Sequence, residues 1–283
     1  MTDKRTVLVG ALGVFILWSF ATWLLEGRMH TLLRPDAVVD RIVYALVGNL
    51  LLGVSVGLAS IVHFTHSGAI KANSAGLGSA RRTLAAVAVG LGLGLGLYVL
   101  LNPPTMNPVV MLNAFSQVFV VSAAEVVVCW AVIGAAAEAS FSQGWTRILL
   151  AALTSSVLFG LYHFAHSPPF NTWGMVGFLT VVGLGTSTFF FASRDVLGTA
   201  VFHNFLGMLG VLQALANAGA LGKMQRIQPM LLGTAVLCVA TVLLFQFVIL
   251  RRRGPQKRVT TVAQHTAGDP GDFKLEARHP RCG

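Results

Sequence analysis

Apolar residues occur along this chain in eight long runs, separated by short polar or proline-containing segments. Each run is close to the roughly 20 residues that a helix needs to cross the hydrocarbon layer of a bilayer. The pattern predicts an all-α fold, a polytopic membrane protein with about eight transmembrane helices. The expected spans lie near 7–25, 42–62, 84–101, 109–136, 148–166, 173–192, 196–216 and 230–250.

Charged residues are few, and they are unevenly placed. They make up 11% of the chain against 55% hydrophobic residues, so a soluble domain could not bury this much apolar surface. With a cytoplasmic N-terminus and eight crossings, fifteen of the twenty Lys and Arg residues lie on the cytoplasmic side. This distribution predicts an integral protein of the cell (plasma) membrane with both termini cytoplasmic. The expected partner is therefore the lipid bilayer, and the net charge of +10 does not indicate nucleic-acid binding.

The spans and their connections suggest an organisation of the chain. The first span follows Lys4 and Arg5 without a small-residue cleavage site, so we expect a retained helix and not a removed signal peptide. Residues 26–41 are expected to form an outside loop, and the glycines of 90–97 to let two helices pack closely. We predict three N-terminal transmembrane helices, a four-helix core, a last transmembrane helix and a basic, disordered cytoplasmic tail, at 1–104, 105–216, 217–250 and 251–283.

Glu125 is the one carboxylate that lies well inside an apolar run. A charged side chain at bilayer depth is costly, and such residues usually face a cavity and have a function. On a helix, Ser122 and Cys129 share the face of Glu125, and the small neighbouring residues leave room for a cavity. A carboxylate in such a place can act as a general base toward water. The alternative is a neutral Glu125 that only bonds a neighbouring helix.

Two histidines lie in later apolar runs. His163 is near the outer end of the fifth span, one turn after Phe159, and His203 is about two turns into the seventh span. His166, three residues after His163, is expected at the membrane interface. Taken alone, His163 could be an interfacial side chain with a solvated tip, and His203 a helix–helix hydrogen-bond donor. Together with Glu125, they could build a site that activates water.

In order and spacing, these residues resemble the CPBP intramembrane protease family, which includes CAAX prenyl-protease-like and bacteriocin-processing (Abi) proteins. The resemblance covers about residues 105–216. The family's first motif matches at Glu125, its F-x-x-x-H motif at Phe159 and His163, and its third motif at His203. The chain departs from the family pattern at three positions: Val126 replaces the second Glu of E-E-x-x-x-R, Trp130 replaces its Arg, and Gly207 replaces the Asn of H-x-x-x-N, although Asn204 adjoins the histidine. In the other possible alignment Glu125 is the second Glu and Ala124 stands in the first place, which the register of Cys129 and Trp130 disfavours.

The resemblance implies an intramembrane endopeptidase that hydrolyses membrane-associated peptides or proteins, prenylated-like or bacteriocin-like among them. In the family the first Glu activates water, and the histidines orient the water and stabilise the oxyanion. These roles transfer to Glu125, His163 and His203, and the role of the Asn passes to Asn204. We expect the substrate to arrive from the cytoplasmic side. The missing motif residues favour an alternative, a catalytically inactive scaffold or immunity-type protein on the same fold.

Other chemistries have weaker support in the sequence. Glu125, His163 and His203 are ligand types that zinc accepts, so they are the expected ligands if a divalent metal binds; without HExxH, we favour a metal-free water. Ser55 fits G-x-S-x-G, a pattern that glycine-rich membrane helices also produce without a catalytic turn. Haem ligation by the two histidines and proton-coupled transport by Glu125 are further alternatives.

A difference in depth opposes a shared site. Counted from the cytoplasmic ends of their spans at about 1.5 Å per residue, Glu125 lies about 16 Å deep, His163 about 22 Å and His203 about 10 Å. The three side chains can meet only if a span boundary differs from its predicted place or the helices tilt. We expect a shift of three or four residues at the start of the fifth span, with little help from tilt.

Overall fold

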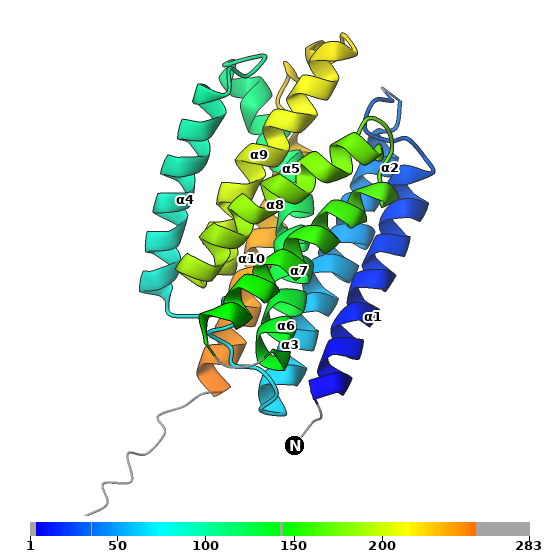
Figure 1. The fold of residues 1–283 in the computed structure, drawn as a ribbon. Coiled ribbons are helices and arrows are strands. Elements are labelled where there is room, and N and C mark those ends of the chain that lie inside the picture. Colours follow the sequence, from blue (N-terminus) through cyan, green and yellow to red (C-terminus); the bar gives the residue numbers. More distant parts are fainter. Residues whose placement is uncertain (1–3, 35, 142–143, 253–283) are drawn as a thin grey trace, which may run out of the picture. The chain divides into compact units, whose positions relative to one another are not determined.

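All regular secondary structure in the computed structural model is helical within the residues it describes, 4–34, 36–141 and 144–252 (Figure 1). The predicted all-α class is therefore confirmed. The elements are α1 (Lys4–Thr22), η1 (Trp23–Gly27), α2 (Val38–Val43), η2 (Tyr44–Val56), α3 (Gly57–His66), α4 (Ala80–Leu100), α5 (Pro108–Glu125), η3 (Val126–Gly134), α6 (Ala135–Ser140), α7 (Trp145–Tyr162), η4 (His163–Ala165), α8 (Trp173–Ser193), α9 (Val196–Asn217), η5 (Leu221–Met224) and α10 (Pro229–Arg252).

Eight helical stretches in the described part of the chain are long and apolar enough to cross a membrane, as predicted. They are Lys4–Gly27, Val38–His66, Ala80–Leu100, Pro108–Ser140, Trp145–Ala165, Trp173–Ser193, Val196–Asn217 and Pro229–Ile249. Their ends differ from the predicted ends by a few residues. The chain is thus an integral membrane protein. Of the predicted tail, residues 253–283 lie outside the described residues.

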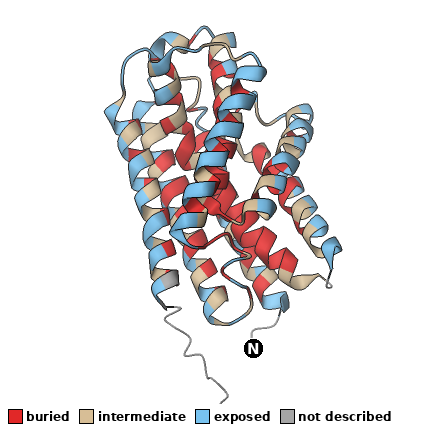
Figure 2. Cartoon of the chain, turned by 90° about the vertical axis from the view of Figure 1, so that its left-hand side faces the viewer, coloured by how far each residue is buried: buried red, intermediate tan, exposed pale blue. Residues whose placement is uncertain are grey.

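The stretch Pro108–Ser140, formed by α5, η3 and α6, is the central helix of the bundle. In its most apolar window 94% of the residues are buried, against 28% for the corresponding window of α4. Figure 2 shows the buried residues gathered in the interior and the exposed ones on the outer faces. Large apolar side chains such as Leu84, Val181 and Phe247 are exposed on these faces, where lipid would cover them.

Side-chain caps fix where the helices of the core begin. Asn107 Oδ1 accepts hydrogen bonds from the backbone N–H groups of Val109 and Val110, and Pro108 occupies the first turn of α5. The Asp195 carboxylate accepts a hydrogen bond from Gly198 N at the start of α9. These caps satisfy backbone N–H groups that the helix itself leaves unpaired. They therefore fix the residue at which each of the two helices that carry Glu125 and His203 begins.

Buried charges anchor the turn between α8 and α9. Arg194, in the left-handed conformation with φ of 53°, donates to Glu138 Oε2 at 2.5 Å and to Glu138 Oε1 at 3.0 Å. Asp195 accepts a hydrogen bond from the Thr83 hydroxyl at 2.6 Å, which joins the turn to α4. Bidentate arginine–carboxylate pairs are geometrically specific, so the turn holds the beginning of α9 against α6 and α4.

Close contact between α4 and α9 depends on glycine. A Cβ at Gly90 would lie 2.6 Å from the carbonyl oxygen of Gly198, and one at Gly94 would lie 2.5 Å from the ring of Phe205. A Cβ at Gly92 would meet nothing within 4 Å. The expected packing role of the glycine run is confirmed for its inward-facing members, since small residues let membrane helices approach.

Replacing Gly90 with Ala should therefore destabilise the protein, while Gly92→Ala serves as the matched control on the opposite face of the same helix. The added methyl group at position 90 meets backbone, which cannot move aside, and overpacking of this kind costs about 1–3 kcal/mol. Thermal unfolding in detergent measures the difference. Equal unfolding temperatures for the two variants would show that the contact between α4 and α9 is not as tight as described.

Candidate functional site

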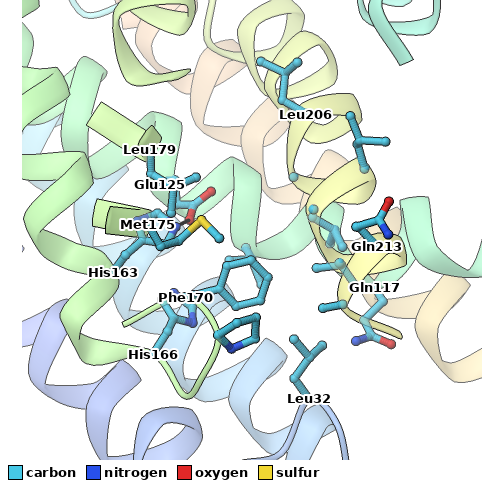
Figure 3. A pocket seen from close by; sticks show the side chains of 18 of the residues that line it. Leu32, Gln117, Glu125, His163, His166, Phe170, Met175, Leu179, Leu206 and Gln213 are labelled. Atoms are coloured by element: carbon cyan, nitrogen blue, oxygen red, sulfur yellow. Dashed lines mark ion pairs between the residues drawn. The ribbon is translucent and has the colours of Figure 1, made fainter. Parts of the chain in front are cut away.

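A cavity of about 500 Å³ lies among α5, α7, α8 and α9. Glu125, His163 and His203 line it together with apolar side chains, among them Met175, Phe178, Leu179, Val182, Leu206 and Leu209. Figure 3 shows Glu125 and His163 at one side of this space and Gln117 and Gln213 across from them. The structure thus brings the three predicted residues into one largely apolar cavity.

The Glu125 carboxylate lies between two imidazole rings. Its Oε2 atom is 3.0 Å from His203 Nε2, and its Oε1 atom is 3.8 Å from His163 Nε2. Glu125 is the last residue of α5, where the helix continues into the wider turns of η3, and turns of this type often occur at functional sites. All three residues are buried, with exposed fractions of 7% or less. The geometry matches the predicted grouping of one carboxylate with two histidines.

Each histidine is oriented through its second ring nitrogen. His163 Nδ1 is 2.9 Å from the carbonyl oxygen of Phe159, to which it can only donate. His203 Nδ1 is 2.8 Å from the Thr186 hydroxyl. The same hydroxyl lies 3.3 Å from the carbonyl oxygen of Val182. When it donates to Nδ1 of His203 instead, Nε2 carries the ring proton and donates a hydrogen bond to Glu125. These second contacts fix the ring orientations and decide which nitrogen faces the carboxylate.

Aromatic side chains hold the two imidazole rings apart. The ring of Phe159 lies edge-to-face against both, with centroids 4.7 Å from His163 and 5.0 Å from His203. Trp130 packs 5.1 Å from Phe159 and 5.4 Å from His203, and its indole N–H donates to Ser187 at 2.7 Å. Trp130, which stands where the family pattern has Arg, is therefore a packing residue next to the site.

Asn204 is not brought into the cavity formed by the described residues. Its Oδ1 accepts a hydrogen bond from the Ser122 hydroxyl at 3.2 Å, and its Nδ2 donates to the carbonyl oxygen of Phe115 at 3.0 Å. Both partners lie on α5. The buried amide thus joins α9 to α5, which supports the approach of His203 to Glu125 without direct contact with the carboxylate.

Sequence reasoning missed two residues of the site, His166 and Glu26. We expected His166 at the membrane interface and Glu26 in the outside loop 26–41, but Glu26 is only 4% exposed and the His166 side chain 12% exposed. His166 Nδ1 is 3.0 Å from Glu26 Oε2, and the same carboxylate accepts from the backbone N–H and the hydroxyl of Ser167. The 3-10 turn η4 stacks the His166 ring on that of His163 at 5.2 Å. The structure thus corrects the expected positions of Glu26 and His166. In the sequence, two features could have indicated their burial: Glu26 is a carboxylate at the end of an apolar run, and His166 follows another histidine by three residues.

The residues that could hold a metal ion also differ from the expected set. One ligand atom from each of Glu125, His163 and His166 lies within 4.8 Å of the other two. His203 is instead hydrogen-bonded to Glu125. The structure therefore groups His166, and not His203, with Glu125 and His163 as potential ligands.

The expected shift in the fifth span is not what brings these side chains to one level. The span begins at Trp145, earlier than predicted, which lengthens the path to His163. Figure 1 shows α7 and α8 running obliquely across the bundle, and α9 starting above the level at which α1 starts. Residue counts along oblique helices do not measure depth, and the expectation that tilt from the membrane normal contributes little stays a prediction.

The cavity lies toward one end of the bundle. Its lining includes Thr31 after η1, Leu101 after α4, Phe170 after η4 and Asn217 at the end of α9. All four elements end on the side opposite the start of α1 (Figure 1). Under the orientation predicted from the charges this is the non-cytoplasmic side, which is at odds with substrate entry from the cytoplasm.

Comparisons with protein-family models, curated proteins and solved structures found no match to this chain.

The geometry predicts that His203→Ala destabilises the protein more than His63→Ala, its control at an exposed position. Removing the imidazole leaves Glu125 Oε2 buried without its partner and opens a cavity, a loss of about 1–3 kcal/mol for the unpaired group alone. Thermal unfolding in detergent again measures the effect. If both variants unfold at the same temperature as the unchanged protein, Glu125 does not depend on His203.

Proposed function

We propose that this chain is an intramembrane endopeptidase of the CPBP type, with Glu125 as the general base. The observation that carries the proposal is the placement of a buried carboxylate 3.0 Å and 3.8 Å from two imidazole nitrogens, in a cavity of about 500 Å³. Carboxylates and histidines in a concave, largely apolar pocket are the usual components of a hydrolytic site. The family resemblance of Glu125, Phe159–His163 and His203 adds support.

The proposed reaction begins with a water molecule beside Glu125 Oε1. The carboxylate accepts a proton from this water, and the hydroxide oxygen bonds to the carbon of the scissile peptide carbonyl. The electron pair of the C=O bond moves to its oxygen, which His163 faces and, when protonated, stabilises. Glu125 then returns the proton to the peptide nitrogen, while the oxyanion electron pair re-forms the C=O bond and the C–N bond breaks with its electron pair on nitrogen. His203 holds the other carboxylate oxygen in place throughout.

The proposed substrate is a membrane-associated peptide or protein segment. Apolar side chains of α8 and α9 wall the cavity, and Figure 1 shows these helices diverging from the turn at Arg194 and Asp195. The cavity lining includes the exposed residues Leu101, Phe178 and Asn217. An extended apolar segment can therefore reach Glu125 from the lipid beside Phe178 or from the end of the bundle where α1 ends. The charges indicate a plasma-membrane protein with cytoplasmic termini. In that orientation, the end of the bundle where α1 ends faces the outside of the cell.

The second candidate is a catalytically inactive scaffold on the same fold. Trp130 supports it, because this side chain packs against Phe159 and His203 where the family pattern has a charged arginine. On that hypothesis Glu125 and His203 form only a structural hydrogen bond between α5 and α9. The two candidates differ in whether the Glu125 carboxylate is needed for anything beyond folding.

Glu125→Gln should abolish hydrolysis while the protein stays folded. Membranes from cells that express the full chain should contain new peptide termini, detectable by mass spectrometry, and the variant should lower their rate of appearance at least about 100-fold, as expected for loss of a general base. His163→Gln should also lower it, whereas His63→Gln, in the similar segment HFTHS, should not. Identical termini with the unchanged chain and with Glu125→Gln would overturn the mechanism. Their absence from both would favour the scaffold.

Thr186 should act as a positioning residue. Thr186→Val removes the hydroxyl that contacts His203 Nδ1 and should lower kcat by about 10-fold with little change in KM, since it disturbs the orientation of a site residue and not the binding walls. Thr186→Ser should restore turnover. The control is Thr188→Val, whose hydroxyl bonds to Leu184 on an exposed face of the same helix. Equal kcat values for Thr186→Val and Thr188→Val would remove Thr186 from the mechanism.

A further inference from the structure

We propose that His163, His166 and Glu125 form a binding site for a divalent transition-metal ion of the zinc class. One ligand atom from each residue lies within 4.8 Å of the other two, at the cavity wall. Two imidazole nitrogens and one carboxylate oxygen are a set that zinc accepts, with a fourth position left for water. The proposal rests on the positions of these side chains. It concerns a metal-bound state, in which Glu125 and His163 are ligands and do not have the roles given to them in the proposed hydrolysis.

His166 provides the first argument. Its Nδ1 atom is bonded to Glu26, while its Nε2 atom is buried and has no hydrogen-bond partner among the described residues. Buried polar atoms without a partner are rare in proteins. A ring held by a carboxylate at Nδ1 presents the lone pair of Nε2, which is the electron pair that a metal ion takes.

His163 provides the second argument. Its Nδ1 atom faces the carbonyl oxygen of Phe159, an acceptor, so this nitrogen carries the proton. In the neutral ring, Nε2 then has a lone pair, and it faces the Glu125 carboxylate at 3.8 Å. A lone pair opposite a carboxylate oxygen is repulsive unless a proton or a metal cation lies between them. A cation in that space would attract Nε2 and the carboxylate together.

The third argument is that every proposed ligand has an outer partner. The partners are the Phe159 carbonyl for His163, the Glu26 carboxylate for His166 and the His203 ring for Glu125 Oε2. Metal-binding histidines almost always donate their other N–H to a carbonyl or carboxylate, and such partners orient the ligands. His203 thus belongs to the outer shell in this proposal, although the sequence predicted it as a ligand.

The geometry favours a transition metal over magnesium or calcium. Those ions prefer oxygen ligands, whereas two of the three groups here are imidazoles.

The spacing of the ligand atoms is close to what zinc requires. Ligand atoms around a tetrahedral zinc ion lie about 3.3 Å apart, given bonds of about 2.0–2.1 Å. The 3.8 Å between Glu125 Oε1 and His163 Nε2 would close by a small side-chain movement.

The test is a cobalt titration of the full, chelator-treated chain in detergent, followed by visible absorption. Tetrahedral Co²⁺ should give intense bands that saturate at one ion per chain and are displaced by Zn²⁺. His166→Gln should lose these bands, and Glu26→Gln should weaken binding by about 10–100-fold, as expected for an outer partner. His66→Gln is the matched control, since it changes the second histidine of HFTHS as His166→Gln changes that of HFAHS.

The proposal is overturned if His166→Gln and His66→Gln bind Co²⁺ alike, or if the unchanged chain gives no tetrahedral bands. Should His166→Gln not fold, X-ray absorption of the zinc-loaded, unchanged chain decides: a shell with two imidazoles supports the site, and a shell of oxygen atoms alone contradicts it. Metal binding and peptide hydrolysis are measured in separate experiments. If Glu125→Gln does not change the peptide termini, the Co²⁺ titration still tests the metal site. If no Co²⁺ binds, the peptide termini still test the proposed hydrolysis.

Discussion

The structure depends on one buried contact, the hydrogen bond between the Glu125 carboxylate and His203 Nε2. A carboxylate in the apolar interior of a membrane protein is costly unless a donor meets it, because burial removes most of its hydration. That donor must come from another helix, so α9 has to approach α5 at this point. The Ser122–Asn204 and Phe115–Asn204 hydrogen bonds, and the close packing of α9 on Gly90 and Gly94 of α4, all hold α9 there.

Aromatic residues supply the rigid frame around this contact. Phe159 separates the two imidazoles, and Trp130 packs against both Phe159 and His203 while its N–H reaches Ser187 on α8. In the family pattern an arginine stands at this position. Here the neutral indole of Trp130 takes the space, and the imidazoles of His163 and His203 are the rings that face the Glu125 carboxylate.

Much of this arrangement could be predicted from the sequence, because its signals were local and strong. Eight apolar runs gave eight spans, and a single carboxylate within one of them pointed to Glu125. The motif spacing identified His163 and His203. The buried contact between Glu26 and His166 could not be predicted in the same way. Both lie at the ends of spans, where a polar residue is ordinary, and only the folding of η1 against η4 buries them together.

Depth was the other quantity that residue counting could not give. His203 is two turns into α9 and His163 at the far end of α7, yet both reach Glu125. The counting rule assumes helices along the membrane normal, whereas α7 and α8 cross the bundle obliquely (Figure 1). Nothing in the apolar pattern of one helix encodes its inclination, which is set by packing against its neighbours.

Solid-state NMR on the full chain in lipid bilayers, with ¹³C-labelled glutamate and ¹⁵N-labelled histidine, tests the central contact most directly. A carboxylate carbon should show a through-space contact with an imidazole Nε2, and that contact should vanish when position 125 is Gln. A second contact, to the Nδ1 of His166, should persist because it belongs to Glu26. A spectrum without any carboxylate–Nε2 contact, or one unchanged by Glu125→Gln, would contradict the shared site.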